Sequence, residues 1–209
     1  MKTHPALAAI EFSDIPAGIL ATDALLKQAP IAFIRCGTIT HGRFLTLFGG
    51  TTAAVEESFA QGLRAGGSCV IDRVLLPDVH PELYAGVQGS RNRVGREALA
   101  LVETATAAAS LLVAEAALKG TPVSLIEIRL ADGGLAGKGV SIYQGALHDL
   151  EAAMQLAEVV LQGRGQTAST RIIPAPADAL LQALAAGTRF ASAAVLELDG
   201  EGESCSSAG

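Results

Sequence analysis

The chain contains no tryptophan, few other aromatic residues and no cluster of basic residues. Only 4% of its 209 residues are aromatic, and its formal net charge is −6. A nucleic-acid-binding surface gathers lysines and arginines on one face or along one helix, and no run of them occurs in this sequence. These absences predict a protein with no nucleic-acid partner.

Long apolar segments are also missing. No uncharged apolar stretch approaches the roughly 20 residues that a membrane-spanning helix needs. The apolar stretch after His4 is interrupted by Glu11, so it is too short for the hydrophobic region of a secretory signal. We therefore expect a soluble, cytoplasmic protein with no membrane partner.

Cysteines are few, and none of them forms a CxxC motif. Cys36, Cys69 and Cys205 lie far apart, which is typical of free thiols in a reducing compartment. We expect Cys36 to be a small buried residue in a strand or at its end. No nucleophile motif, P-loop or dinucleotide-binding glycine motif is present, so the sequence gives no support for an enzyme.

Apolar residues make up half of the chain, whereas charged residues make up only 17%. Alanine, leucine, valine and glycine dominate, so the interior relies on small, closely packed side chains. A protein this apolar must bury a large part of its surface in a core or in an assembly interface.

The two halves of the sequence repeat each other. Residues 11–27 align with residues 103–119 at a constant offset of 92, which matches acids, lysines and prolines along one register. The matched pairs are Glu11 with Glu103, Asp23 with Glu115, Lys27 with Lys119, and Pro30 with Pro122. Further along, Gly50 falls on Gly145 at an offset of 95. An insertion in one loop of the second copy explains the change, and the repeat indicates a duplicated fold unit.

Each copy predicts the same order of elements. The first copy has strands near residues 7–12, 31–35, 43–48 and 69–76, and helices near residues 15–28 and 52–63. The second has strands near residues 98–103, 123–129, 138–143 and 170–173, and helices near residues 107–119 and 147–161. The order βαββαβ predicts an α+β fold of the ferredoxin-like type, present twice.

The repeat also predicts the domain boundaries. We expect a first domain at residues 5–88 and a second at residues 97–190, joined by a polar linker rich in glycine and arginine. Residues 191–209 form a tail whose last part is acidic and rich in serine and glycine. Such a composition predicts disorder.

Several segments resemble one known family. Residues 21–30 read ATDALLKQAP and residues 114–122 read AEAALKGTP, and both resemble the first helix of bacterial microcompartment shell domains. The run GRFLTLFGG at residues 42–50, followed by VEES at residues 55–58, resembles the family's third strand and second helix. The segment DVHPEL at residues 78–83 resembles the segment after the first domain in non-permuted tandem shell proteins. The resemblance covers roughly residues 6–190.

The resemblance implies a structural shell protein and not an enzyme. In this family, single-domain members form flat hexamers that tile into the shell of a metabolic organelle. Tandem members form trimers whose six domains imitate that hexagon around a central pore. The implied partners are further copies of this chain in a homotrimer, other microcompartment shell proteins, and small metabolites that pass through the pore.

The family also implies that the turn between the second and third strands of each copy faces the pore. The pore-lining residues would be Thr40, His41 and Gly42 in the first copy, and Gly133, Gly134, Leu135, Ala136 and Gly137 in the second. Glycines let the backbone approach the axis closely and adopt positive φ. The two turns differ in length, and the offset between the copies changes at this point.

Some tandem relatives hold an iron–sulfur cluster on the axis through a cysteine in the first pore loop. This sequence has Thr40 at that position, so we expect no cluster and no cofactor. Three symmetry-related His41 side chains offer ligands that a divalent metal accepts. A histidine that simply faces water is the simpler interpretation, and we expect no metal.

Lys27 and Lys119 resemble the lysines with which shell hexagons contact neighbouring tiles. A solvated lysine favoured by the helix dipole would explain either residue alone, whereas its recurrence in both copies favours the tile-edge role. An arginine that family members often carry after the last strand is absent here, where Asp78 and Ala175 stand.

Two other functions remain open at this point. Duplicated ferredoxin-like units also occur as cytosolic sensors that bind a small molecule between their domains. A shell electron carrier with a metal centre in the pore is the second alternative.

Overall fold

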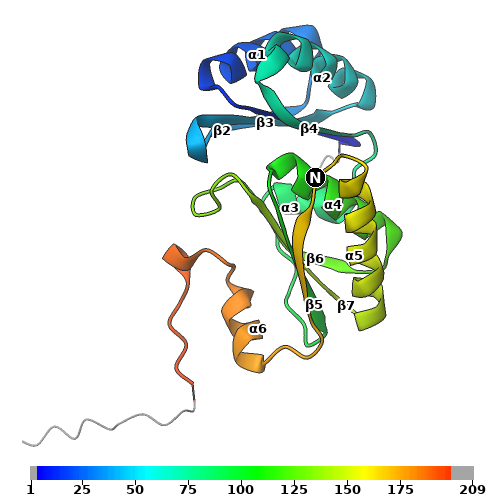
Figure 1. Cartoon of the computed structure of the whole chain (residues 1–209), viewed down its shortest axis with the longest axis vertical. Coiled ribbons are helices and arrows are strands. Elements are labelled where there is room, and N and C mark those ends of the chain that lie inside the picture. Colours follow the sequence, from blue (N-terminus) through cyan, green and yellow to red (C-terminus); the bar gives the residue numbers. More distant parts are fainter. Residues whose placement is uncertain (1–3, 199–209) are drawn as a thin grey trace, which may run out of the picture.

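The computed structural model describes residues 4–198, which form two similar halves (Figure 1). The first half contains β1 (Ala6–Phe12), α1 (Ile15–Gln28), β2 (Phe33–Ile39), β3 (Arg43–Gly50), α2 (Thr52–Gly66), β4 (Val70–Leu76) and α3 (Pro81–Val87). The second half contains β5 (Ala98–Thr104), α4 (Ala107–Gly120), β6 (Ser124–Leu130), β7 (Gly139–Gly145), α5 (Leu147–Gln162), β8 (Ala168–Ile173) and α6 (Asp178–Ala185). No helix in these ranges is both long and apolar enough to cross a bilayer.

The two sheets have the same topology. Their strand orders are β2-β3-β1-β4 and β6-β7-β5-β8, and every paired strand is antiparallel. Glu11 pairs with Leu45 in the first sheet, and Glu103 pairs with Val140 in the second. These equivalent pairs reproduce the offsets of 92 and 95 found in the sequence. The predicted duplication of a ferredoxin-like βαββαβ unit is confirmed.

The first helix of each half begins at a side-chain cap. The Asp14 carboxylate accepts the Ala17 N–H at 2.7 Å, and the Thr106 hydroxyl accepts the Ala109 N–H at 3.1 Å. Such caps satisfy backbone donors that the first helical turn leaves free. α1 ends one residue before Ala29-Pro30, since proline disfavours a helical conformation in the residue before it.

Three details differ from the sequence predictions. β2 is displaced toward the C-terminus and extends to Ile39, whereas the sequence predicted its end near residue 35. Cys36 is exposed and not buried, because β2 is an edge strand of its sheet. Part of the expected tail has local structure, since Phe190–Ser192 form a 3-10 turn that residues 193–198 follow without regular structure. Residues 199–209 lie outside the described part.

Helix α4 joins the two halves. α1 and α2 cover one face of the first sheet, and α4 of the second half packs against β1 and β4 on the other face (Figure 1). Leu7, Leu47 and Leu76 of the first sheet therefore share one continuous apolar core with Leu111 and Ala117 of α4. α3 extends this junction by packing against β6 and α4. Burial of this apolar surface holds the two halves together.

A buried polar cluster accompanies this contact. Oε1 of Glu11, on β1, accepts the Ala108 N–H at the start of α4 at 2.9 Å, and Glu11 is fully buried. Nearby, the Asp72 carboxylate accepts hydrogen bonds from the Thr106 hydroxyl and, at 2.5 Å, from the Arg164 guanidinium. The start of α4 is thus held by two carboxylates of the first sheet, as the positive end of the helix dipole favours.

Burial of the Glu11 carboxyl at this position is energetically unfavourable. Its second oxygen, Oε2, has no hydrogen-bond partner. Desolvation by burial, with a further contribution from the charge of Asp72, raises the pKa of Glu11 to about 7. Because the carboxyl in an unfolded chain titrates near 4.5, the stability that its neutral form supplies is lost as the pH rises from there to about 7.

Glu11→Gln should remove this loss, since glutamine stays neutral and its oxygen can still accept the Ala108 N–H. The shift corresponds to about 3 kcal/mol. We expect the decrease in unfolding free energy between pH 4.5 and pH 8, measured by urea denaturation, to be smaller in the variant by about this amount. An equal decrease in both proteins would contradict the assignment.

Candidate pore loops

The first loop is a tight turn between β2 and β3. Thr40–Gly42 form a 3-10 turn in which His41 (φ 64°) and Gly42 (φ 68°) adopt left-handed backbone conformations. Glycine adopts this conformation without strain, and histidine is among the residues that tolerate it. All three residues are exposed. Thr40, His41 and Gly42 therefore present a hydroxyl, an imidazole and bare backbone to the solvent.

The second loop is longer and consists of two successive turns. The Leu135 N–H donates to the Asp132 carbonyl at 3.1 Å, and the Lys138 N–H donates to the Leu135 carbonyl at 2.9 Å. Gly134, Ala136 and Gly137 all have positive φ, a conformation that glycine adopts without strain and alanine adopts rarely. Gly133, Gly134 and Ala136 are exposed, Leu135 is half-buried and Gly137 is buried.

An arginine of the second sheet holds the base of this loop. Arg129, on β6, is 7% exposed and donates to the Asp132 carboxylate through Nε at 3.1 Å and Nη2 at 2.7 Å. Arg129 also donates to the Gly133 carbonyl and to Thr188, and Arg189 donates to the same carboxylate. Buried charge-assisted hydrogen bonds of this kind are strong and directional. They fix residues 132 and 133, at the start of the loop.

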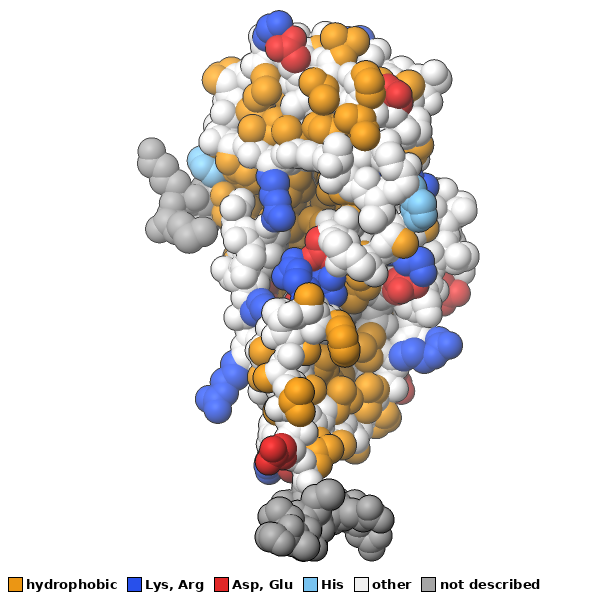
Figure 2. All heavy atoms as spheres, turned by 90° about the vertical axis from the view of Figure 1, so that its left-hand side faces the viewer, with side chains coloured by type: hydrophobic (Ala, Val, Ile, Leu, Met, Phe, Trp, Pro, Cys, Tyr) orange, Lys and Arg blue, Asp and Glu red, His pale blue; other side chains and the backbone are white. Residues whose placement is uncertain are grey.

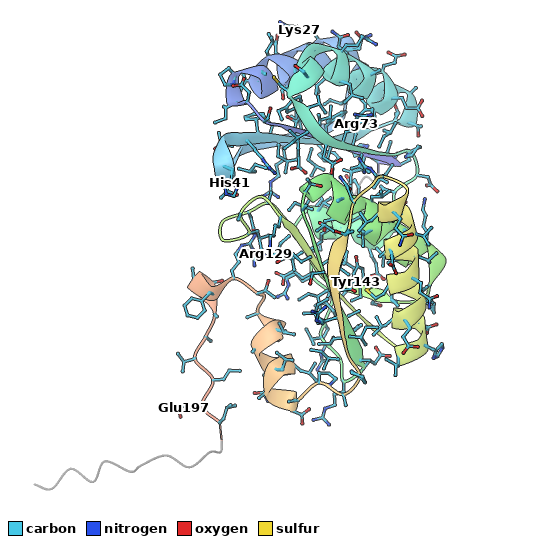
Figure 3. All side chains as sticks on the ribbon, in the orientation of Figure 1. Lys27, His41, Arg73, Arg129, Tyr143 and Glu197 are labelled. Carbon is cyan, nitrogen blue, oxygen red and sulfur yellow. The ribbon has the colours of Figure 1, made fainter. Side chains whose placement is uncertain are left out.

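The two loops meet within a single chain. A Cβ atom placed on Gly137 would lie 3.7 Å from Oγ1 of Thr40 and 3.5 Å from Nη1 of Arg43. Both loops therefore lie on the same side of the molecule, where His41 and Arg129 appear in Figure 3. The structure thus brings together residues that are almost 100 positions apart in the sequence.

The sequence did not single out Arg129, Asp132 and Arg189. Arg129 lies between Ile128 and Leu130 in a strand that also contains Glu127, and Asp132 follows three residues later. Charged residues between apolar residues of a strand are a signal, since charged residues are rarely buried without a partner. The contribution of Arg189 has no such local signal. No group of three metal-ligating side chains occurs within residues 4–198.

The two candidate edge lysines occupy equivalent helix ends in different surroundings. The Lys27 amine pairs with Asp23 at 2.5 Å, and both side chains are exposed. The Lys119 amine pairs with Glu115 at 2.8 Å and also donates to the Asp78 carbonyl of the first half. Its hydrogen bond with Glu115 raises the pKa of Lys119. Lys119 therefore lies at the junction between the two halves, whereas Lys27 lies on the side of the first half that faces away from the second (Figure 3).

Comparison with known proteins identifies the class of protein. The family model for the BMC domain matches the chain twice, at residues 6–79 and 98–176. Together with the repeated fold, this match shows that the chain belongs to the BMC-domain family, as a tandem-domain shell protein of bacterial microcompartments.

Particular relatives agree with this assignment. The chain is 29% identical over 182 residues to the bacterial microcompartment shell protein PduT of Citrobacter freundii, covering 87% of this chain and 98% of that protein. A microcompartment protein from Desulfitobacterium hafniense superimposes with a TM-score of 0.75 at 28% identity, covering 86% of this chain and 99% of the other.

A more distant structure shows the same fold. The double-ringed trimeric shell protein MSM0271 from the RMM microcompartment has a TM-score of 0.56 at 13% identity, over 75% of this chain and 82% of its own. The predicted family and location in a microcompartment shell are confirmed by these comparisons.

Arg129→Met should release the second loop while keeping a side chain of similar length. The loop would lose its charge-assisted hydrogen bonds, and Asp132 would keep only Arg189. We expect a loss of about 2 kcal/mol in stability and faster amide exchange over residues 131–138, measured by hydrogen–deuterium exchange. Arg64→Met, on exposed α2, is the control and should change neither. Unchanged exchange in the loop would contradict the anchoring role.

Proposed function

We propose that the protein is a trimeric, pseudohexagonal shell tile with a central pore for small metabolites. One observation carries the proposal. The face of α4 that packs against the first half is buried, whereas the equivalent face of α1 is exposed to solvent in the single chain. A duplicated unit that makes this contact once within the chain can make it again with the next chain. Closure after three chains is what the family implies.

The exposed side chains of α1 support the second contact. Ile19 and Leu26 are 54% and 45% exposed, whereas their counterparts on α4, Leu111 and Leu118, are 0% and 5% exposed. Removing such large apolar side chains from water stabilises an interface by about 25 cal/mol for each Å². α1 of one protomer would therefore pack against β5 and β8 of the next, as α4 packs against β1 and β4.

The polar residues of this surface also match in pairs. Within the chain, the Thr106 hydroxyl donates to the Asp72 carboxylate. The counterpart of Thr106 is Asp14, and the counterpart of Asp72 is Ser169, since Glu11 pairs with Asp72 and Glu103 with Ser169. The donor and the acceptor have exchanged places, so a hydroxyl–carboxylate bond remains available between protomers. Asp14 and Ser169 are both exposed in the single chain.

The loops support the pore. In such a ring the first loop (Thr40, His41 and Gly42) would alternate around the axis with the second loop (residues 133–137). Selectivity would then depend on the bore and on the hydroxyl, imidazole and backbone groups that line it. Lys27 would take, at the junction between protomers, the position that Lys119 has within the chain, and both would lie where neighbouring tiles meet. The relatives are shell proteins, which supports a structural and not an enzymatic role.

Ile19→Glu tests the ring, because it would place a charge in the proposed interface between protomers. Wild-type protein should have three times the chain mass of 21.2 kDa by light scattering, and the variant should have the mass of one chain. Val159→Glu is the matched control, since Val159 is 64% exposed on α5 and its counterpart is the exposed Arg64. A wild-type mass below a trimer would refute the proposal.

Thr40→Trp tests the pore without touching the interface. Three indole rings at the axis should narrow the opening and lower the single-channel conductance of the trimer in planar bilayers by several-fold. Glu57→Trp, on exposed α2, should leave the conductance unchanged. Equal conductance of Thr40→Trp and wild type would place the opening elsewhere.

A further inference from the structure

A hollow of about 530 Å³ lies beside the loops, between the first sheet and the second half. Leu45 and Leu47 of β3 and Leu130 of β6 supply apolar atoms to its lining, and Arg35, on β2, lies at its edge. Figure 2 shows this side of the molecule, with Lys and Arg side chains gathered at mid-height around a recess that contains apolar atoms. The size falls in the range of sites for small organic ligands.

The surroundings of the hollow are positively charged, although the chain as a whole is acidic. A smaller recess shares Arg35 and Asp132 with the hollow, and both borders together hold four arginines and two acids, an excess of two positive charges (4 − 2). The other members of this group are Arg91, Arg129, Arg189 and Glu127.

Arg35 is the available cation of this group. Arg91 pairs with Glu127, and Arg129 and Arg189 both pair with Asp132. Arg35 is exposed and forms no ion pair with any residue in the described part of the chain. A guanidinium beside a partly apolar recess is a strong partner for a carboxylate or phosphate group.

The equivalent surface of the second sheet is largely covered by another segment of the chain. Gly37 and Leu45 pair in the first sheet, and their counterparts Arg129 and Val140 pair in the second. There, Arg129 donates to Thr188, and the Thr188 N–H donates to Glu127 at 3.2 Å. The segment after α6 thus covers the second sheet, whereas the segment after α3 turns away to become the linker. In the second copy, residues after α6 therefore occupy the position that the hollow has in the first copy.

We propose that this hollow binds a small organic anion. Its carboxylate or phosphate group would lie on Arg35, and its short apolar chain would lie over Leu45 and Leu47. All lining residues belong to one chain, so the site does not require the trimer, although it shares Thr40 and Gly133 with the proposed pore loops. A ring of three chains would hold three such sites beside the loops.

Methyl NMR of leucine-labelled protein tests the site. Butyrate and n-butyl phosphate should shift the methyl signals of Leu45, Leu47 and Leu130 in a saturable manner, whereas n-butylammonium should not. Arg35→Gln should weaken binding about tenfold or more, as loss of a hydrogen bond to a charged group does. Arg64→Gln, at an exposed site on α2, should bind as wild type does.

Three results would overturn the proposal. These are no saturable shift with either anion, equal shifts with n-butylammonium, or undiminished binding by Arg35→Gln. The acidic end of the chain is the competing occupant. Shifts of the same methyl signals on deletion of residues 193–209, with no gain in butyrate binding, would assign the hollow to that segment instead.

Discussion

The packing of α4 on the first sheet is the contact on which the rest of the molecule depends. A four-stranded sheet with helices on one side still has an apolar face to bury, and here the second half of the chain covers that face. The contact sets the distance between the two halves and brings the two loops together at Thr40 and Gly137. It also buries Glu11 without a full set of partners. The hydrogen bond that holds the start of α4 in place is therefore accompanied by the unfavourable desolvation of the Glu11 carboxyl.

The contact made by α4 also explains why the exposed apolar side chains of α1 are of interest. Ile19 and Leu26 would be ordinary as single apolar residues on a surface. Their counterparts Leu111 and Leu118 are buried, however, and this comparison supports the proposed interface on α1. In the proposed trimer, the contact that α4 makes within the chain would serve as the template for the contact that α1 makes with the next chain. The hydroxyl–carboxylate pair Thr106–Asp72 within the chain has the counterpart pair Ser169–Asp14, which would form between protomers in the proposed trimer.

The two halves differ mainly in their loops and in the segments that follow α3 and α6. The strands and helices of both halves correspond in order and register, whereas the loops differ in length and in their support. The second loop is anchored by Arg129 and Arg189, while the first is a short turn with His41 in a left-handed conformation. The segments after α3 and α6 also take different paths, and the recess beside the first sheet is larger than the one beside β6 of the second. The differences between the copies are thus concentrated near the loops.

The sequence alone determined the duplication, the order of elements and the family, because these depend on local patterns and on matches between the copies. It also located both loops, since a change of offset can be read without coordinates. Only the tertiary structure decided the exposure of Cys36, which results from the place of β2 at the edge of its sheet. The same holds for the arginines around Asp132 and for the open hollow at Arg35. These features join residues that are far apart along the chain, and no local propensity encodes which distant side chains will meet once the two halves have packed.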